Sequence, residues 1–454
     1  MTFGKYGALF AAIGVLSSCT EAIEQPDLVT DAPYAADSGT LLVHCGALID
    51  GVGDEATGPV YVLVEKGRIK LIASDLEAAI GIATLDLSDK TCLPGIIDMH
   101  THILEAPEDW EDVTRYFDYT LEYTLNNGRR FAGLTLLAGV TTVRNLGVYT
   151  GWSSRMLRDE INEGSAIGPR LQVAAFYLTI PGGGGDLLAP GVDEEDIPPH
   201  LRLGVARGVG EFRRKARDAV DGGADVLKII ASGAVLAHGG VPGSPEMTPE
   251  EIAAVVEVGH AAGLRVTAHS HGAQSIKDAI NAGVDSIEHA SLIDDEGIRL
   301  AAENDVALSM DIYGGDWIAV EGRNQNWPEE FIRKNDEVTL AQRQNFRKAH
   351  AAGVAIVYGT DAGIYPHGMN TLQFRHMVEW GMTPMEAIKA ATSVAANYMG
   401  WGDRIGSIRP GYYADIVAVS GEPLSDITVL ENVDSVVKGG LVFKAPADRV
   451  RQDK

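Results

Sequence analysis

The ten residues Leu93-Pro94-Gly95-Ile96-Ile97-Asp98-Met99-His100-Thr101-His102 decide the fold of this chain. They read as a buried strand that ends in two histidines spaced by one residue. Successive side chains of a strand point to opposite faces, so the two imidazoles lie on the same face. Two imidazoles on one face can bind one metal ion. The stretch therefore predicts a metal site at the end of a strand.

Composition and charge narrow the class of protein. The chain has 454 residues, of which 45% are hydrophobic and 22% charged, which is ordinary for a globular protein. Its 63 acidic and 37 basic residues give a net charge of −26. A chain this acidic is a poor candidate for binding nucleic acid or an anionic membrane surface. The excess of acids is compatible with solubility alone.

The N-terminus reads as a targeting segment. Lys5 precedes a short apolar stretch, Ala8–Leu16, that is too short to span a bilayer. Leu-Ser-Ser-Cys at 16–19 resembles a bacterial lipobox, with Cys19 as the lipid-modified residue; a plain signal peptide with an incidental cysteine is the alternative. We expect a lipoprotein signal peptide over 1–19 and a tether over 20–37. Thr20, in place of Asp, favours a lipid anchor in the outer membrane of a bacterial cell envelope, facing the periplasm.

Short strands separated by glycines occupy both ends of the remaining chain. Examples are Thr40–Cys45, Val60–Val64 and Asp415–Val419. They predict a small β-sandwich domain built from residues 38–93 and 401–445. Cys45 and Cys92 fall in its first part, and an oxidising compartment would permit a disulfide. The sequence does not show whether these two cysteines are close together.

The middle of the chain alternates between strands and helices. Helical stretches such as Pro249–Ala262 and Glu337–Ala352 separate most of the strands, and glycines 139, 223, 263, 283 and 353 stand where helices are expected to end. Eight strands alternating with helices predict an α/β fold, a (β/α)8 TIM barrel over 94–400. The eight apolar runs are Gly95–Asp98, Thr141–Leu146, Arg170–Ala175, Val226–Ser232, Arg265–His269, Ser286–His289, Ala307–Ile312 and Ala355–Thr360.

Five of these strands end in residues that can bind metal or move protons. The carboxyl ends of barrel strands meet at one rim, where such folds place their chemistry. Each residue has a simpler explanation: a histidine can be a core residue, Lys228 can pair with a buried acid, and Asp361 can cap a helix. Five independent explanations of that kind at one rim are improbable together. The predicted metal-site residues are His100, His102, Lys228, His269, His289 and Asp361.

This arrangement resembles the amidohydrolase superfamily over nearly the whole chain after residue 19. The run Asp403–Gly411, followed by Ala414–Val417, is typical of members whose chain leaves the barrel and returns to the β-sandwich. The stretch Ala224–Ile229 resembles the imidazolonepropionase-like group, with its bridging lysine retained. That group includes prolidase-like dipeptidases, dipeptidases that prefer a C-terminal Arg or Lys, and hydrolases of N-acyl amino acids.

The resemblance implies a centre of two divalent metal ions. The histidines of the first strand would bind the inner ion, those of the fifth and sixth strands the outer ion, and Asp361 the inner ion. Lys228, carboxylated to a carbamate, would bridge both. An ammonium has no lone pair for a metal, but burial in an apolar strand lowers the lysine pKa and makes the neutral amine accessible. Zinc suits these ligands, and other divalent ions remain open.

The resemblance also implies metal-assisted hydrolysis of an amide bond. Xaa-Pro or Xaa-Arg/Lys dipeptides and N-acyl amino acids are the small-molecule substrates that fit best. Asp361 would act as base and then as acid. His271 would hydrogen-bond the oxyanion or only assist the ligands. Tyr313 is the first candidate to bind a substrate carboxylate, followed by His238 and Arg144.

Two departures from the relatives bear on the substrate. Residues 182–186 read Gly-Gly-Gly-Gly-Asp where relatives often show Gly-Gly-His-Gly-Asp, so Gly184 replaces a histidine that could touch substrate. Arg144-Asn145 replaces the usual Arg-Asp. Hydrolysis of a cyclic amide, an ester or a lactone is an alternative, as is a non-enzymatic, metal-stabilised surface binding protein. A homo-oligomer is compatible with the sequence.

Overall fold

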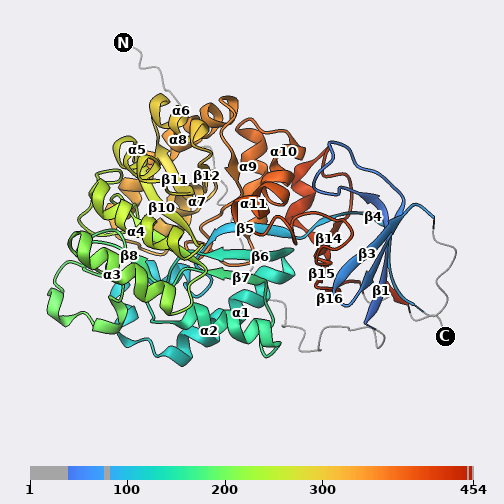
Figure 1. Cartoon of the computed structure of the whole chain (residues 1–454), viewed down its shortest axis with the longest axis horizontal. Coiled ribbons are helices and arrows are strands. Elements are labelled where there is room, and N and C mark those ends of the chain that lie inside the picture. The colour runs from blue at the N-terminus through green and yellow to red at the C-terminus, as the bar shows by residue number, and fades with distance from the viewer. Residues whose placement is uncertain (1–38, 76–81, 447–448, 452–454) are drawn as a thin grey trace, which may run out of the picture. The chain divides into compact units, whose positions relative to one another are not determined.

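The chain folds into a parallel α/β barrel joined to a small β domain, in a computed structural model that describes residues 39–75, 82–446 and 449–451 (Figure 1). The predicted fold class is confirmed. Elements β7 and β8 are two pieces of one barrel strand, interrupted at residues 174–176. The barrel strands are β5 (Ile96–Thr101), β6 (Val140–Asn145), β7 (Arg170–Val173), β8 (Tyr177–Leu178), β9 (Val226–Ile230), β10 (Arg265–Gly272), β11 (Ser286–Leu292), β12 (Ala307–Ser309) and β13 (Ile356–Val357).

Backbone hydrogen bonds close the barrel. The strands pair in the orders β5-β6-β7 and β8-β9-β10-β11-β12-β13, with parallel neighbours throughout. Met99 N donates to Tyr358 O at 2.8 Å, which joins β5 to the residue after β13. Asp225 N donates to Val173 O at 2.8 Å and joins β7 to the start of β9. All strand carboxyl ends therefore meet at one rim, where barrels place their active sites.

Helices surround the barrel and follow its strands along the chain. Strong end signals set their limits: Thr248 and Glu251 form a capping box at the start of α4, with Pro249 in the first turn. The five glycines expected at helix ends all have φ between +74° and +97°, the left-handed conformation that a helix C-cap requires. The principal helices are α1 (Leu121–Leu137), α2 (Ser153–Glu163), α3 (Gly208–Asp221), α4 (Pro249–Ala261), α5 (Ala273–Ala282), α6 (Asp295–Glu303), α8 (Glu329–Ala351), α9 (Gln373–Glu379), α10 (Pro384–Ala390) and α11 (Ser393–Tyr398).

Strands from both ends of the chain form the small β domain. They make one sheet in the order β16-β15-β14-β4-β1-β2-β3, with β17 also paired to β4. Figure 1 shows the blue N-terminal strands beside the red C-terminal ones. The strands are β1 (Thr40–Leu48), β2 (Val60–Glu65), β3 (Arg68–Ala73), β4 (Ala83–Pro94), β14 (Ile416–Val419), β15 (Val433–Lys438), β16 (Leu441–Lys444) and β17 (Val450–Arg451).

The sheet of the small domain curls around a core of its own. Ile69 N, on β3, donates to Tyr412 O at 2.9 Å, four residues before β14, so the two sides of the sheet approach each other. Cys45 on β1 and Cys92 on β4 lie in this core and form a disulfide, which answers the question that the sequence left open. The core is separate from the main cluster that fills the barrel and its helices.

The predicted signal peptide, the lipidation site Cys19 and the tether lie outside the described residues, so they stay predictions. The domain boundaries predicted from the sequence also stay predictions. Among the described residues, no helix combines the length and the apolar character needed to cross a membrane.

Candidate metal centre

The six side chains predicted to bind metal line one cavity at the carboxyl end of the barrel. Four of them lie in β5, β9, β10 and β11, one directly follows β5, and one lies in the loop after β13. Each of the six residues is at most 8% exposed. The structure therefore brings together His100, His102, Lys228, His269, His289 and Asp361.

Asp361 lies between the two histidines of β5. Its Oδ1 is 3.2 Å from His100 Nε2 and 3.1 Å from His102 Nε2. The backbone holds it there, because Asp361 N donates to His100 O at 2.7 Å. Asp361 also has a φ of +59°, a left-handed conformation that is uncommon outside glycine and concentrates at functional sites. The position of Asp361 beside the two histidines is thus fixed by backbone as well as side-chain contacts.

A second group of histidines lies beside this first one. Potential ligand atoms of His269, His271 and His289 all lie within 4.8 Å of one another, as do those of His100, His289 and Asp361. The two groups share His289. His271, which the sequence assigned to the oxyanion or to a helper role, therefore lies among the predicted ligands. Its Nδ1 is 2.8 Å from Ser291 Oγ.

Two histidines of this second group, His269 and His271, are held neutral, whereas the neighbouring Asp311 raises the pKa of His289 despite burial. Burial lowers the pKa of His269 and of His271 well below the usual value, and the neighbouring His289 lowers both further. Burial also lowers the pKa of His100, to about 4, against the opposing effect of Asp361. A neutral imidazole offers the lone pair that a metal ion requires.

Lys228 has the environment that carboxylation needs. Burial lowers its pKa to about 8, although Glu288 and Asp361 act in the opposite direction. The neutral amine is therefore accessible near neutral pH, and it is the neutral amine that can react with carbon dioxide.

The residues of the cavity fit a divalent metal. His269 Nε2 is buried and has no hydrogen-bond partner among the described residues. Buried polar atoms are seldom left unpaired, so an orphaned imidazole nitrogen beside further potential ligands indicates a missing partner. A bound cation would provide it. Imidazole and carboxylate together suit zinc and several other divalent ions.

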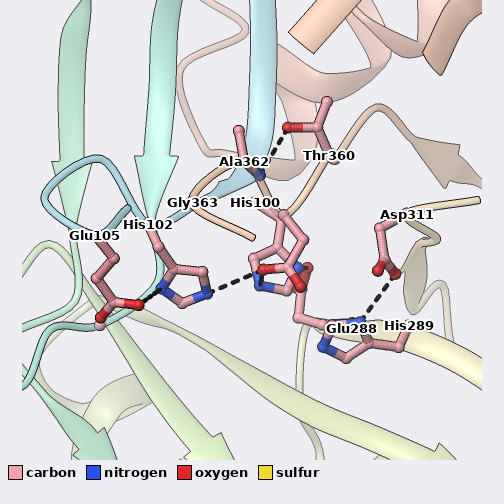
Figure 2. Close-up of polar contacts among 12 residues, drawn as sticks. His100, His102, Glu105, Glu288, His289, Asp311, Thr360, Ala362 and Gly363 are labelled. Atoms are coloured by element: carbon pink, nitrogen blue, oxygen red, sulfur yellow. Dashed lines mark hydrogen bonds and ion pairs between the residues drawn. The ribbon is translucent and has the colours of Figure 1, made fainter. Parts of the chain in front are cut away.

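Sequence reasoning missed the residues that hold the histidines in place. The Tyr177 hydroxyl is 2.8 Å from His102 Nδ1 and donates to Glu105 Oε1 at 2.9 Å; Figure 2 shows Glu105 beside His102. On the other side, His289 Nδ1 lies 2.9 Å from Asp311 Oδ1 (Figure 2). Such partners orient metal-binding histidines. Of these partner residues, Glu105 could have been found from its place in the sequence, because it follows His102 by only three residues.

Glu288 anchors the centre from below. Its Oε2 is 3.0 Å from His100 Nδ1, and its Oε1 accepts a hydrogen bond from Arg144 at 2.7 Å. Arg144 and Glu288 are both about fully buried, at 1% and 0% exposure. Asp98 is a second buried carboxylate with partners from a distant segment. It accepts hydrogen bonds from Thr360 Oγ1 at 2.6 Å and from Asn370 Nδ2 at 2.8 Å.

The three residues predicted to bind a carboxylate are not among those that line the cavity, and their role stays a prediction. Arg144 is bound to Glu288 and to Met99 O beneath the centre. His238 pairs with Glu330, with 3.5 Å between Nδ1 and Oε2. Tyr313 packs its ring against Tyr365, with 5.0 Å between centroids. The polar groups of Arg144 and His238 are thus engaged by tertiary contacts that the sequence does not reveal.

Gly184 does line the cavity, where relatives often have a histidine. Its N–H donates to Glu246 Oε2 at 2.9 Å. A Cβ at this position would lie 2.9 Å from Ala234 Cβ and 3.1 Å from Ile230 Cγ2. The backbone therefore packs too closely against the end of β9 to accept a larger side chain without movement.

Comparison with known proteins identifies the class to which this site belongs. The model of the amidohydrolase family matches residues 91–442, so the chain belongs to this family and is an enzyme. It is 31% identical to the ochratoxinase of Aspergillus niger over 432 residues, which cover 89% of this chain and 87% of the relative.

Two solved structures share the fold over almost their whole length. A Xaa-Pro dipeptidase with methionine bound in its active site is 36% identical, with a TM-score of 0.83 over 89% of this chain and 100% of the other. A prolidase complexed with N-methylphosphonate-L-proline is 26% identical, with a TM-score of 0.84 over 90% of this chain and 100% of the other. The superfamily predicted from the strand-end residues is confirmed.

Proposed function

We propose that this protein is a metal-dependent hydrolase of amide bonds in small molecules, acting on Xaa-Pro dipeptides or N-acyl amino acids. One observation carries the proposal: four buried histidines, a buried lysine and Asp361 converge on one cavity, and one of the imidazole nitrogens has no partner among the described residues. The similarity to a Xaa-Pro dipeptidase and to an ochratoxinase supports an amide substrate.

Two divalent ions, zinc in the simplest case, would be held by the six residues, with Lys228 as a carbamate between them. When bound, they would polarise the substrate carbonyl and lower the pKa of water in the site. The neutral state of His269 and His271 supports this assignment, because no proton has to be displaced from them.

The remaining steps belong to the side chains of this chain. Asp361 takes the proton of the attacking water and passes it to the leaving nitrogen, acting first as base and then as acid. Its contacts with His100 and His102 hold its pKa well below the usual range despite burial, so it is ionised in the described structure. His271, with Nδ1 occupied by Ser291, keeps Nε2 for the carbonyl oxygen or for a metal.

The experiment is a turnover assay on protein prepared with and without metal. Chain lacking residues 1–19 is stripped with a chelator and reconstituted with zinc, manganese or cobalt, and metal per chain is measured by elemental analysis. Each form is assayed on Xaa-Pro dipeptides and N-acyl amino acids, with a cyclic amide, an ester and a lactone as comparisons. We expect metal-dependent cleavage of the linear amides.

Two variants sharpen this assay. Asp361→Asn removes the proposed base at the centre, and Asp305→Asn changes a remote aspartate that pairs with Tyr398. Only the first should abolish turnover. If the reconstituted enzyme cleaves cyclic amides or esters but no linear amide, the dipeptidase and N-acyl assignment is wrong. If chelation leaves turnover unchanged, the proposal that turnover depends on a metal centre is wrong.

A further inference from the structure

Part of the cavity is lined by apolar side chains. One lies at the end of β9, one lies on α8, and the others follow β5, β6, β12 and β13. All are at most 7% exposed. We call this set the apolar wall: Trp110, Tyr149, Ile230, Ile318, Val338 and Ile364.

The side chains of the apolar wall pack closely against neighbouring residues. Trp110 Nε1 donates to Gly363 O at 3.3 Å, in the loop that carries Asp361. The ring of Tyr149 lies 4.9 Å from that of Tyr177 and 5.0 Å from that of Tyr116. A Cβ on Gly314 would come 2.8 Å from Ile364 Cδ1, so Ile364 packs directly against the backbone at Gly314. Such a wall is preformed and selects by shape and polarity.

The two carboxylates that line the cavity, Asp311 and Asp361, already have partners among the described residues. Asp311 accepts from Gln342 at 3.0 Å and contacts His289. Asp361 contacts His100 and His102. An ammonium or carboxylate placed against the apolar wall would lose part of its hydration and find no charged partner in the wall, which is unfavourable.

We propose that the apolar wall restricts this enzyme to amides that carry a bulky, uncharged, apolar side chain next to the scissile bond. Among the dipeptide classes that the family offers, this excludes substrates with Arg or Lys at the walled position. The inference rests on the proposed function, because it names the side chain that the hydrolase accepts.

Isosteric substrates test the charge alone. Norleucine and lysine side chains have the same length and differ by the terminal ammonium. We would measure kcat/KM for Nle-Pro against Lys-Pro, and for N-acetyl-norleucine against N-acetyl-lysine, on metal-replete wild-type enzyme. The norleucine member should be favoured by about 100-fold in each series that is turned over.

A ratio below about 10 in every active series would overturn the apolar-wall inference while leaving amide hydrolysis intact. If neither member of either pair is cleaved, the proposed function fails and this inference fails with it. The two failures are therefore distinguishable, and neither needs a variant protein.

A pair of variants locates the selection in the wall. Ile318→Asp places a carboxylate in the wall and should lower the norleucine-to-lysine ratio at least about 10-fold. Leu340→Asp makes the same change on α8 at a residue that is 59% exposed and does not line the cavity, and should leave the ratio unchanged. Equal effects of both variants, or none from Ile318→Asp in folded protein, would contradict selection by the wall.

Discussion

The hydroxyl of Tyr177 stands between His102 and Glu105, 2.8 Å from the histidine Nδ1 and 2.9 Å from the carboxylate Oε1. The hydroxyl donates to Glu105, so its oxygen is free to accept the Nδ1 proton of His102. With a metal ion bound, this arrangement would leave the lone pair on His102 Nε2, the nitrogen that faces Asp361. A tyrosine at the cavity wall is thus placed to hold a predicted metal ligand in the tautomer that binds metal.

Removing this hydroxyl should weaken the metal centre. We expect Tyr177→Phe to lower metal affinity about 10- to 100-fold, the usual effect of losing a hydrogen bond to a ligating histidine. Competition with a fluorescent chelator measures the change. Tyr398→Phe is the control, because Tyr398 bonds to the remote Asp305. Unchanged affinity in Tyr177→Phe would show that His102 needs no help from this residue.

Asp361 should affect catalysis more than assembly. Asp361→Asn keeps the shape of the side chain and removes its basicity, so we expect kcat to fall by about 10²- to 10⁴-fold. The melting temperature and at least part of the metal content should persist, since the other five ligands remain. A variant that retains turnover within a few-fold of wild type would exclude Asp361 as the proton acceptor.

Carbon dioxide should be required to assemble the centre. Capture needs the neutral amine, and burial lowers the pKa of Lys228 to about 8, so reconstitution should become faster as pH rises through that value. We expect apoenzyme reconstituted without bicarbonate to be poorly active, with recovery on its addition and a carbamate signal from ¹³C-bicarbonate by NMR. Lys228→Met should bind less metal and show no response to bicarbonate. Bicarbonate-independent reconstitution of wild type would rule out the carbamate.

The strand-end ligands could be predicted because topology alone brings them together. Parallel strands of a barrel end at one rim, so a residue such as His269 needs only the right place in its own strand to reach the centre. The ends of the helices could be predicted from equally short stretches of sequence, since Gly283 and the other glycines at helix ends need only a left-handed φ. These features depend on short stretches of sequence and carry over directly into the fold.

Contacts between distant segments could not be predicted in this way. Arg144 has the charge to bind a carboxylate, yet its partner Glu288 lies 144 residues further along the chain. Tyr177 and Glu105 meet only because a short strand piece and a loop fold together. Substrate-binding side chains depend on such loop packing, so short stretches of sequence place the metal-site residues in one cavity but do not place the carboxylate-binding residues there.

The Arg144–Glu288 pair should be a structural requirement. Arg144→Leu leaves the Glu288 carboxylate buried without its cation, and we expect the free energy of unfolding to fall by about 3–5 kcal/mol. Thermal and denaturant unfolding measure it. Arg299→Leu breaks an exposed pair with Glu303 on α6 and should cost less than about 1 kcal/mol. If Arg144→Leu is as stable as this control and instead raises KM, Arg144 binds substrate after all.

Lys438 gives a pH-dependent prediction far from the centre. Burial lowers its pKa to about 8, and Arg170 lowers it further while Asp415 opposes the shift. Between about pH 8 and the ordinary lysine pKa of about 10.4, the unfolded chain holds a proton that the folded chain has lost, so this residue's contribution to stability improves as pH rises. Lys438→Met should therefore raise the free energy of unfolding at pH 7 by about 1–2 kcal/mol, allowing for the lost bond to Gly168 O, and this advantage should shrink by pH 10.

Denaturant unfolding of wild type and Lys438→Met at pH 7, 8.5 and 10 measures the difference. Lys70→Met on the same domain is the control, because the Lys70 side chain is 63% exposed. An advantage that grows with pH would reverse the sign of the argument and show that the ammonium of Lys438 stabilises the fold.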